Sequence, residues 1–290
     1  MRAAGRKLSA VPVKSVRPLM QISHAFIASM IAVIFSPPSR AQDGVKPATP
    51  AAQEKRTIAE EIAVLEKGRL SAKQRAFARL GVHSDAAADD VLRKQFESYR
   101  AGELRPTMWL DLFEAMAKRT NAEFTKLLAE REERLAKSAD PVRRFEECLE
   151  GGNGEEGRAI FTKKPEAGCI RCHAVDGKGG QIGPELTWLR NATERSHILE
   201  SIILPNSTVA TGFDSVVLKL KNGETVAGVV RGESAEEITL ASFADGKRST
   251  VKVSGIAERT PLPSPMPQHF GHVLDKRAIR DLVEFIAAGD

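Results

Sequence analysis

The chain lacks a basic surplus once its first 41 residues are set aside. Those residues hold six of the 43 Lys and Arg side chains and none of the 38 Asp and Glu side chains, so the remainder carries 37 basic and 38 acidic groups. Folded domains that bind nucleic acids or anionic lipids need a basic excess. The charge balance therefore predicts no nucleic-acid partner.

Long apolar runs are also missing. The run at residues 25–35 has eleven residues, whereas a transmembrane helix needs about twenty. It follows a basic leader and precedes a small-x-small ending at Ser39 and Ala41, the pattern of a secretory signal. We therefore expect residues 1–41 to be a signal peptide, cleaved after Ala41, and the mature protein to be periplasmic or otherwise exported, with no membrane span. A membrane anchor is the alternative.

Only three cysteines are present, at positions 148, 169 and 172. Two of them open Cys169-Ile-Arg-Cys172-His173, the C-x-x-C-H motif of covalent haem attachment. In this chemistry the two thiols add to the haem vinyl groups and the adjacent imidazole becomes the proximal iron ligand. The motif predicts one covalent haem c bound through Cys169, Cys172 and His173.

Two other uses of this motif have little support. A thioredoxin-like redox pair needs a βαβ context, which the glycine-rich flanks do not supply. A zinc site needs a second ligand pair, and Cys148 is the one remaining cysteine. With the other two bound to haem, Cys148 has no partner, so we expect it to be buried, with an intermolecular disulfide as the alternative.

Of the six methionines, only Met266 follows the haem motif. It lies in the proline-rich stretch at residues 261–268, which can form neither a regular helix nor a central strand. A stiff loop of this kind can carry a thioether to the open face of the iron at little entropic cost. We expect Met266 to be the second axial ligand, with His269 and His272 as the alternatives.

Residues 55–149 are rich in strong helix formers. We expect a helical domain there, joined to the leader by a flexible Ala/Pro linker at residues 42–54. Four to six short helices would form a bundle or a HEAT-like stack that acts as a scaffold. Its apolar residues recur at helical spacing: Ile58, Ile62, Leu65, Phe77, Leu80, Val91, Leu92, Phe96, Trp109, Leu112, Phe113, Met116, Phe124, Leu127 and Leu128.

Further helices are predicted at residues 155–161, 193–203 and 275–288. Gly157 would let another helix approach closely, and Thr193 would cap the second of these helices. Between residues 213 and 256 the apolar period becomes two, with turn signals at Asn222-Gly223 and Asp245-Gly246. This pattern predicts an insertion of four antiparallel strands. The residues themselves do not indicate its role; we expect it to shield a haem edge, with a docking role as the alternative. The apolar positions are Val216, Leu218, Leu220, Val226, Val230, Ile238, Leu240, Val251 and Val253.

Several blocks together resemble the haem-binding cytochrome c domain of planctomycetes and verrucomicrobia. They are Gly157-Arg-Ala-Ile-Phe161, the motif at 169–173, Gly179-Gly-Gln-Ile-Gly-Pro-Glu-Leu186, Leu199-Glu-Ser-Ile-Ile-Leu-Pro-Asn206 and Ser264-Pro-Met-Pro267. The resemblance covers residues 150–288 and implies a class I cytochrome c core with His173 and Met266 as ligands. It also implies that the Pro184 carbonyl holds the Nδ1–H of His173. The expected fold class is mainly α: a helical domain, then a cytochrome c domain at 150–290 with a small β insertion at about 213–256.

These features predict an electron-transfer haem protein rather than an enzyme. It would act as a monohaem carrier or as the electron-accepting partner of a periplasmic dehydrogenase, so its partners would be redox proteins. Iron with both axial positions filled has no place for a substrate. Two alternatives remain: a peroxidase or gas sensor with a labile Met266, and a helical protein-binding module that carries a redox group.

Overall fold

The structure is a computed structural model that describes residues 56–289. The predicted signal peptide at 1–41 and the linker at 42–54 lie outside the described residues, and both stay predictions. In the described part of the chain, no helix is long and apolar enough to cross a membrane.

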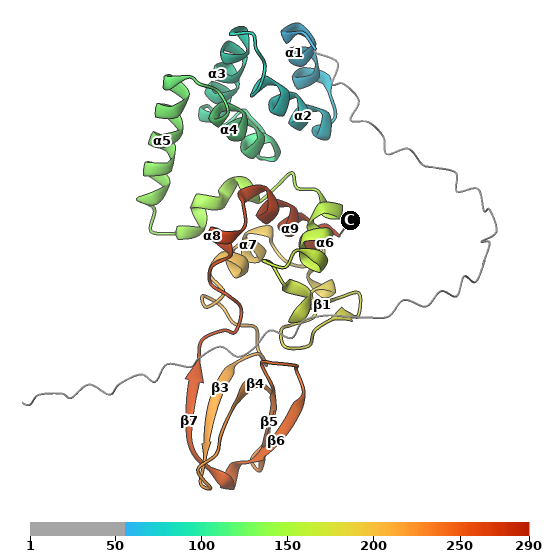
Figure 1. Ribbon diagram of the computed structural model, residues 1–290, viewed down its shortest axis with the longest axis vertical. Helices are drawn as coiled ribbons and strands as arrows, with labels where there is room; N and C mark the ends of the chain where they lie inside the picture. Colours follow the sequence, from blue (N-terminus) through green and yellow to red (C-terminus); the bar gives the residue numbers. More distant parts are fainter. Residues whose placement is uncertain (1–55, 290) are drawn as a thin grey trace, which may run out of the picture. The chain divides into compact units, whose positions relative to one another are not determined.

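The first part of the described chain is helical, as predicted (Figure 1). Its helices bury one apolar cluster that contains Phe77, Leu92, Met116 and Phe124. Ile62, predicted to be internal, is instead 38% exposed. The elements are α1 (Ile58–Lys67), α2 (Leu70–Leu80), α3 (Ala87–Arg100), η1 (Pro106–Met108), α4 (Trp109–Ala117), α5 (Ala122–Ala136) and η2 (Pro141–Cys148).

Short helices and one small hairpin surround the haem motif. They are α6 (Gly154–Lys163), η3 (Cys169–Arg171), β1 (Ala174–Val175), β2 (Lys178–Gly179), η4 (Thr187–Leu189), α7 (Arg195–Ile203), α8 (Phe270–Val273) and α9 (Lys276–Ala288). The Asn153 and Asp275 side chains accept hydrogen bonds from backbone N–H groups and so cap α6 and α9. The predicted cap at Thr193 is wrong, because α7 begins after Glu194, whose side chain caps nothing.

Helices α6 and α9 cross closely (Figure 1). A Cβ atom on Gly157 would collide with the carbonyl oxygen of Asp281 and would lie 2.7 Å from the Phe285 Cβ. The prediction that Gly157 admits a second helix is therefore confirmed. The Phe161 and Phe285 rings pack at this crossing with their centroids 5.6 Å apart.

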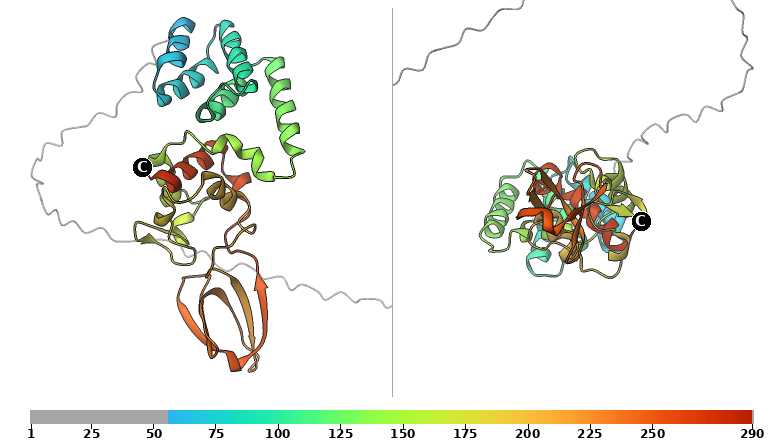
Figure 2. Two further views of the ribbon diagram at one scale, coloured as in Figure 1. Left: turned by 180° about the vertical axis from the view of Figure 1, so that it is seen from behind. Right: turned by 90° about the horizontal axis from the view of Figure 1, so that it is seen from below.

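The remaining strands form one antiparallel sheet in the order β6-β5-β4-β3-β7. Figures 1 and 2 show it twisted and strongly curved. It buries its own apolar cluster, which includes Val216, Leu218, Ile238 and Leu240. The elements are β3 (Ser215–Leu220), β4 (Thr225–Glu233), β5 (Glu237–Ala241), β6 (Arg248–Lys252), η5 (Val253–Gly255) and β7 (Ile256–Leu262).

The predicted fold class, mainly α with a small β insertion, is wrong. The five-stranded sheet with its own core is a substantial part of the fold, which combines α and β structure. The strand missed is β7, which begins where the predicted insertion ends and whose last two residues belong to the proline-rich stretch that was predicted to form no central strand. Pro261 lies opposite Val216 on a strand whose one neighbour is β3. A proline is tolerated there because an edge strand leaves alternate N–H groups unpaired.

Buried ion pairs connect α9 with the preceding helices. Asp111 on α4 and Arg280 on α9 are each 3% exposed and lie 2.7 Å apart, oxygen to nitrogen. Glu147 on η2 likewise accepts from Arg131 at 2.8 Å and from Lys276 at 2.7 Å. Buried charges are tolerated only when they are paired, so these contacts fix how α9 packs on α4, α5 and η2.

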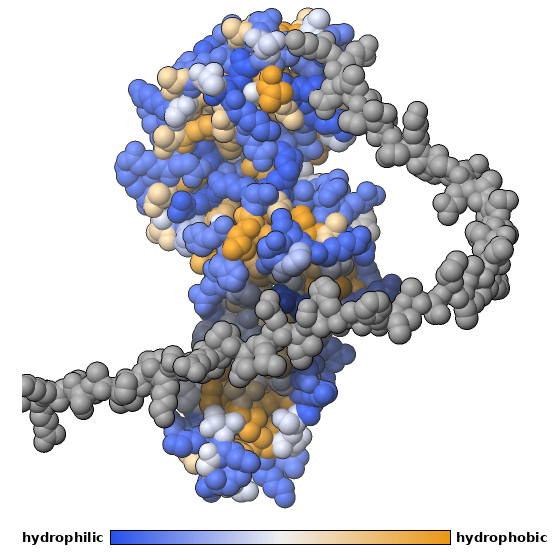
Figure 3. Space-filling model, viewed as in Figure 1, coloured by the Kyte–Doolittle hydropathy of each residue, from blue (hydrophilic) through white to orange (hydrophobic). Residues whose placement is uncertain are grey.

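The surface carries few large apolar side chains. On the face shown in Figure 3, most of the described surface is hydrophilic and the apolar residues form separate patches. The most exposed of the large apolar residues are Trp188 on η4, at 78%, and Val82 in the turn after α2, at 71%.

We predict that Gly157→Ala destabilises the protein by at least about 1 kcal/mol, because overpacking a close crossing outweighs the better helix propensity of Ala. The matched control is Gly255→Ala, where a Cβ meets nothing within 4 Å. Urea denaturation of both variants measures the difference. Equal midpoints would show that the crossing has room for a methyl group.

Candidate functional site

The haem motif forms a single tight turn. Gly168, with φ of 58°, leads into η3, and the His173 N–H donates to the Cys169 carbonyl at 2.9 Å. Both thiols are free and half-buried. The turn therefore places Cys169, Cys172 and His173 next to one another.

The loop after the motif is hydrogen-bonded back onto it. The Gly180 N–H donates to the Ile170 carbonyl at 2.8 Å, and the Gly183 N–H donates to the Cys172 carbonyl at the same distance. A Cβ on Gly180 would collide with the Arg171 carbonyl. Glycine is required here because the two backbones are in contact.

This loop fixes the His173 ring. Its Nδ1 lies 3.0 Å from the Pro184 carbonyl oxygen, the contact that the resemblance implied. A carbonyl only accepts hydrogen bonds, so Nδ1 carries the proton and Nε2 of the neutral ring keeps its lone pair. Burial lowers the pKa of His173. The ring is therefore neutral at pH 7, the form that can bind iron.

Gly183 supplies the surface on which the ring packs. A Cβ there would lie 2.7 Å from Nδ1 and 2.9 Å from Nε2 of His173. This glycine, which lies in the block at residues 179–186, was assigned no role in the sequence analysis. A glycine before a proline gives no such signal by itself, since the close approach depends on the tertiary fold.

Burial raises the pKa of the two thiols, whereas it lowers that of His173. It raises the pKa of Cys169 to about 11 and raises that of Cys172 as well. Redox-active C-x-x-C pairs lower the pKa of one cysteine to obtain a thiolate. The two thiols here stay protonated at neutral pH, which does not suit dithiol exchange.

Met266 is half-buried and packs against the same apolar cluster as Cys169. Its loop is anchored on the N-terminal side of Met266, because the Ser264 N–H donates to Asn206 Oδ1 at 2.7 Å and the Ser264 Oγ accepts from the Met266 N–H at 3.2 Å. Asn206 follows α7, and sequence reasoning gave neither Asn206 nor Ser264 a role. The alternative ligands His269 and His272 are exposed.

Cys148 is fully buried, and its thiol lies 3.2 Å from the Lys276 carbonyl oxygen. Burial raises its pKa. This agrees with the expected buried thiol, and its burial leaves no surface for an intermolecular disulfide.

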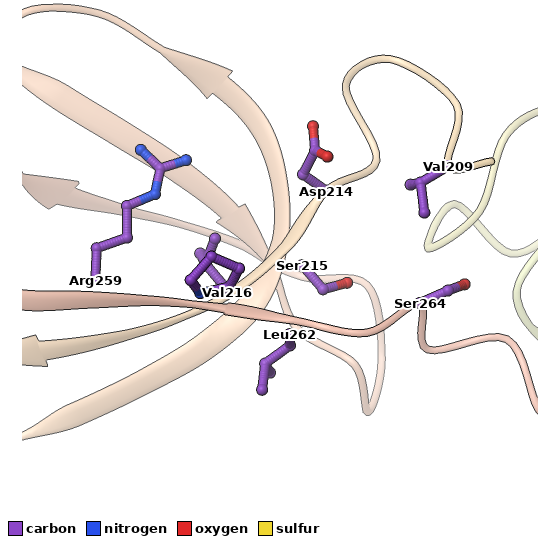
Figure 4. A pocket seen from close by; sticks show the side chains of 8 residues that line it. Val209, Asp214, Ser215, Val216, Arg259, Leu262 and Ser264 are labelled. Atoms are coloured by element: carbon purple, nitrogen blue, oxygen red, sulfur yellow. The ribbon is translucent and has the colours of Figure 1, made fainter. Parts of the chain in front are cut away.

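A hollow of about 210 Å³ lies where β3 and β7 meet the loops that flank them (Figure 4). Its lining includes Asp214, Ser215 and Arg259, and Ser264 borders it from the methionine loop. The Ser215 Oγ is buried and has no hydrogen-bond partner among the described residues. None of the haem-motif residues lines this hollow.

The residues present fit a covalent haem. A neutral imidazole with a free Nε2 lone pair, two adjacent protonated thiols and a glycine cradle behind the ring are what attachment requires. Among the described residues, no three His, Cys, Asp or Glu side chains gather as a metal-binding group.

No family model matches the chain, and no curated protein matches it.

We predict that Gly183→Ala displaces the His173 ring and weakens its bond to the Pro184 carbonyl, because the new Cβ and the ring cannot share the same space. Two-bond nitrogen–proton NMR correlations report the tautomer, measured in a Cys169→Ala/Cys172→Ala background that cannot attach haem. We expect the Nδ1–H tautomer in this background and its loss on adding Gly183→Ala. Gly232→Ala, whose Cβ meets nothing within 4 Å, is the control. An unchanged tautomer in the Gly183 variant would contradict the cradle.

Proposed function

We propose that this chain is an exported monohaem c-type cytochrome that transfers electrons. The observation that carries the proposal is the His173 ring, held through Nδ1 by the Pro184 carbonyl at 3.0 Å directly after two free thiols. This arrangement suits an imidazole that presents Nε2 to iron while the neighbouring sulfurs anchor the macrocycle.

Each residue then has a distinct task. Cys169 and Cys172 form thioether bonds that prevent loss of the cofactor outside the cell. His173 and, from its proline-rich loop, Met266 would be the two iron ligands. When bound, haem supplies a one-electron couple between ferric and ferrous iron.

Filled axial positions favour electron transfer over catalysis on a substrate. A thioether ligand also raises the reduction potential, which suits an acceptor of electrons from a dehydrogenase. We therefore propose a carrier, or the electron-accepting partner of a periplasmic dehydrogenase that performs the catalysis. A haem enzyme or gas sensor would need Met266 to leave the iron, and the hydrogen bond from Ser264 to Asn206 anchors the loop against that movement.

We predict that haem stays with the wild-type polypeptide in acidified organic solvent, because thioether bonds survive that treatment. Cys169→Ala with Cys172→Ala should release it. Cys148→Ala, which removes the buried third thiol, is the control and should keep its haem. Wild-type haem that extracts, or a wild type that never acquires haem in a host with the attachment machinery, would overturn the proposal.

We also predict that Met266→Ala opens the distal face of the iron. The reduced variant should bind carbon monoxide readily, lose the weak sulfur-to-iron absorption band and have a lower reduction potential, since the thioether that stabilises ferrous iron is gone. His269→Ala, which removes an exposed alternative ligand, should change none of the three. A wild type that binds carbon monoxide rapidly, with no effect of Met266→Ala, would favour the enzyme or sensor.

A further inference from the structure

The five-stranded sheet contacts the haem motif directly. Ile182, Val229 and Ala241 are buried in one small apolar cluster, against which Cys172, Phe213 and Phe243 also pack. We call these six residues the joining cluster. It brings β4 and β5 to the second thiol of the motif and to the residue before Gly183. Residues of β4 near Val229 therefore lie beside the space that a haem bound at Cys172 would fill.

Arg231 is a residue of β4 that has no pairing partner on β5. The register of β4 on β5 shifts between Val230 and Gly232, which leaves Arg231 as the extra residue of a β-bulge. Bulges redirect a side chain and are frequent beside functional sites. Here the guanidinium stacks on Phe213 of the joining cluster, with Cζ 4.1 Å from the ring centroid.

The charge of Arg231 is not balanced within the described residues. Its Nη1 is buried and has no hydrogen-bond partner there, and no described carboxylate forms an ion pair with it. Burial and, second, repulsion from the charge of Arg248 lower its pKa. Arg231 as a whole is half-buried, but a buried guanidinium nitrogen without a hydrogen-bond partner is costly. On the same sheet, Arg259 is paired with Glu233 at 2.7 Å.

We infer that Arg231 binds a propionate carboxylate of the haem attached at Cys169 and Cys172. The inference rests on the proposed function, since the propionates are the anionic groups of that cofactor. A planar guanidinium can donate two parallel hydrogen bonds to one carboxylate, and stacking on Phe213 holds its plane. The sheet thus contributes a cofactor-binding residue as well as a shield for the haem edge.

The test compares purified, haem-loaded wild type with Arg231→Gln, Arg231→Lys and Arg259→Gln. We expect Arg231→Gln to shift the reduction potential downward, because removing a nearby cation favours ferric iron. Arg231→Lys should restore most of the potential. Arg259→Gln removes an exposed charge from the same sheet and should leave the potential unchanged, because solvent screens it. A resonance Raman band of the propionates should move in both Arg231 variants, since lysine cannot reproduce the planar fork.

Several outcomes separate this inference from the proposed function. Absence of covalent haem in the wild type overturns both. Haem-loaded wild type and Arg231→Gln with the same potential and the same propionate band overturn the role of Arg231 alone. An effect that appears only after a redox partner is added would assign Arg231 to a partner carboxylate instead. Should Arg231→Gln fail to mature, the wild type still decides, because a propionate band unmoved between H₂O and D₂O excludes an N–H donor.

Discussion

The close approach of the loop at residues 178–186 to the haem motif is the constraint on which the site depends. Two hydrogen bonds join the loop to the backbone of the motif, and a third joins it to Ala174 directly after the motif. Glycines stand where a side chain would collide. Because the loop lies so near, the Pro184 carbonyl reaches Nδ1 of His173 and Gly183 supports the ring. The imidazole is thereby fixed in tautomer and direction, which would lower the cost of ordering an iron ligand.

The same loop connects the site to the rest of the molecule. Ile182 belongs to the joining cluster and thus ties the loop to β4 and β5, while Cys169 and Met266 pack against the cluster centred on α7 and α9. The position of α9 is set in turn by Gly157 and by the buried Asp111–Arg280 pair. A disturbance at the helix crossing is therefore expected to reach the methionine loop through the shared apolar core.

Local sequence signals predicted what depends on local structure. Helical spacing identified buried residues such as Phe77 and Phe124, and period two identified Leu218 and Leu240 in the sheet. The predictions were wrong where tertiary contacts decide strand pairing, the start of a helix or the exposure of a side chain. Pro261 pairs because β7 is an edge strand, Thr193 does not cap because α7 begins two residues later, and Ile62 is exposed although its spacing is helical. The C-x-x-C-H spacing alone was enough to select Cys169, Cys172 and His173 as candidate site residues, whereas the role of Pro184 came from a family resemblance.

Arg231 illustrates what periodicity cannot predict. A bulge has no signature in the alternation of apolar residues, and the sequence does not show that one nitrogen of this guanidinium is buried without a partner. The residues around Arg231 suggest what the sheet does for the site. The sheet buries its own apolar cluster, so it is rigid enough to hold a charge in place, and the joining cluster presents Phe213 and Phe243 beside Cys172. Excluding water from one edge of a haem disfavours the more highly charged ferric state, while a cation at a propionate acts in the same direction. A sheet in this position would therefore raise the potential set by the axial ligands, which suits a protein that accepts electrons.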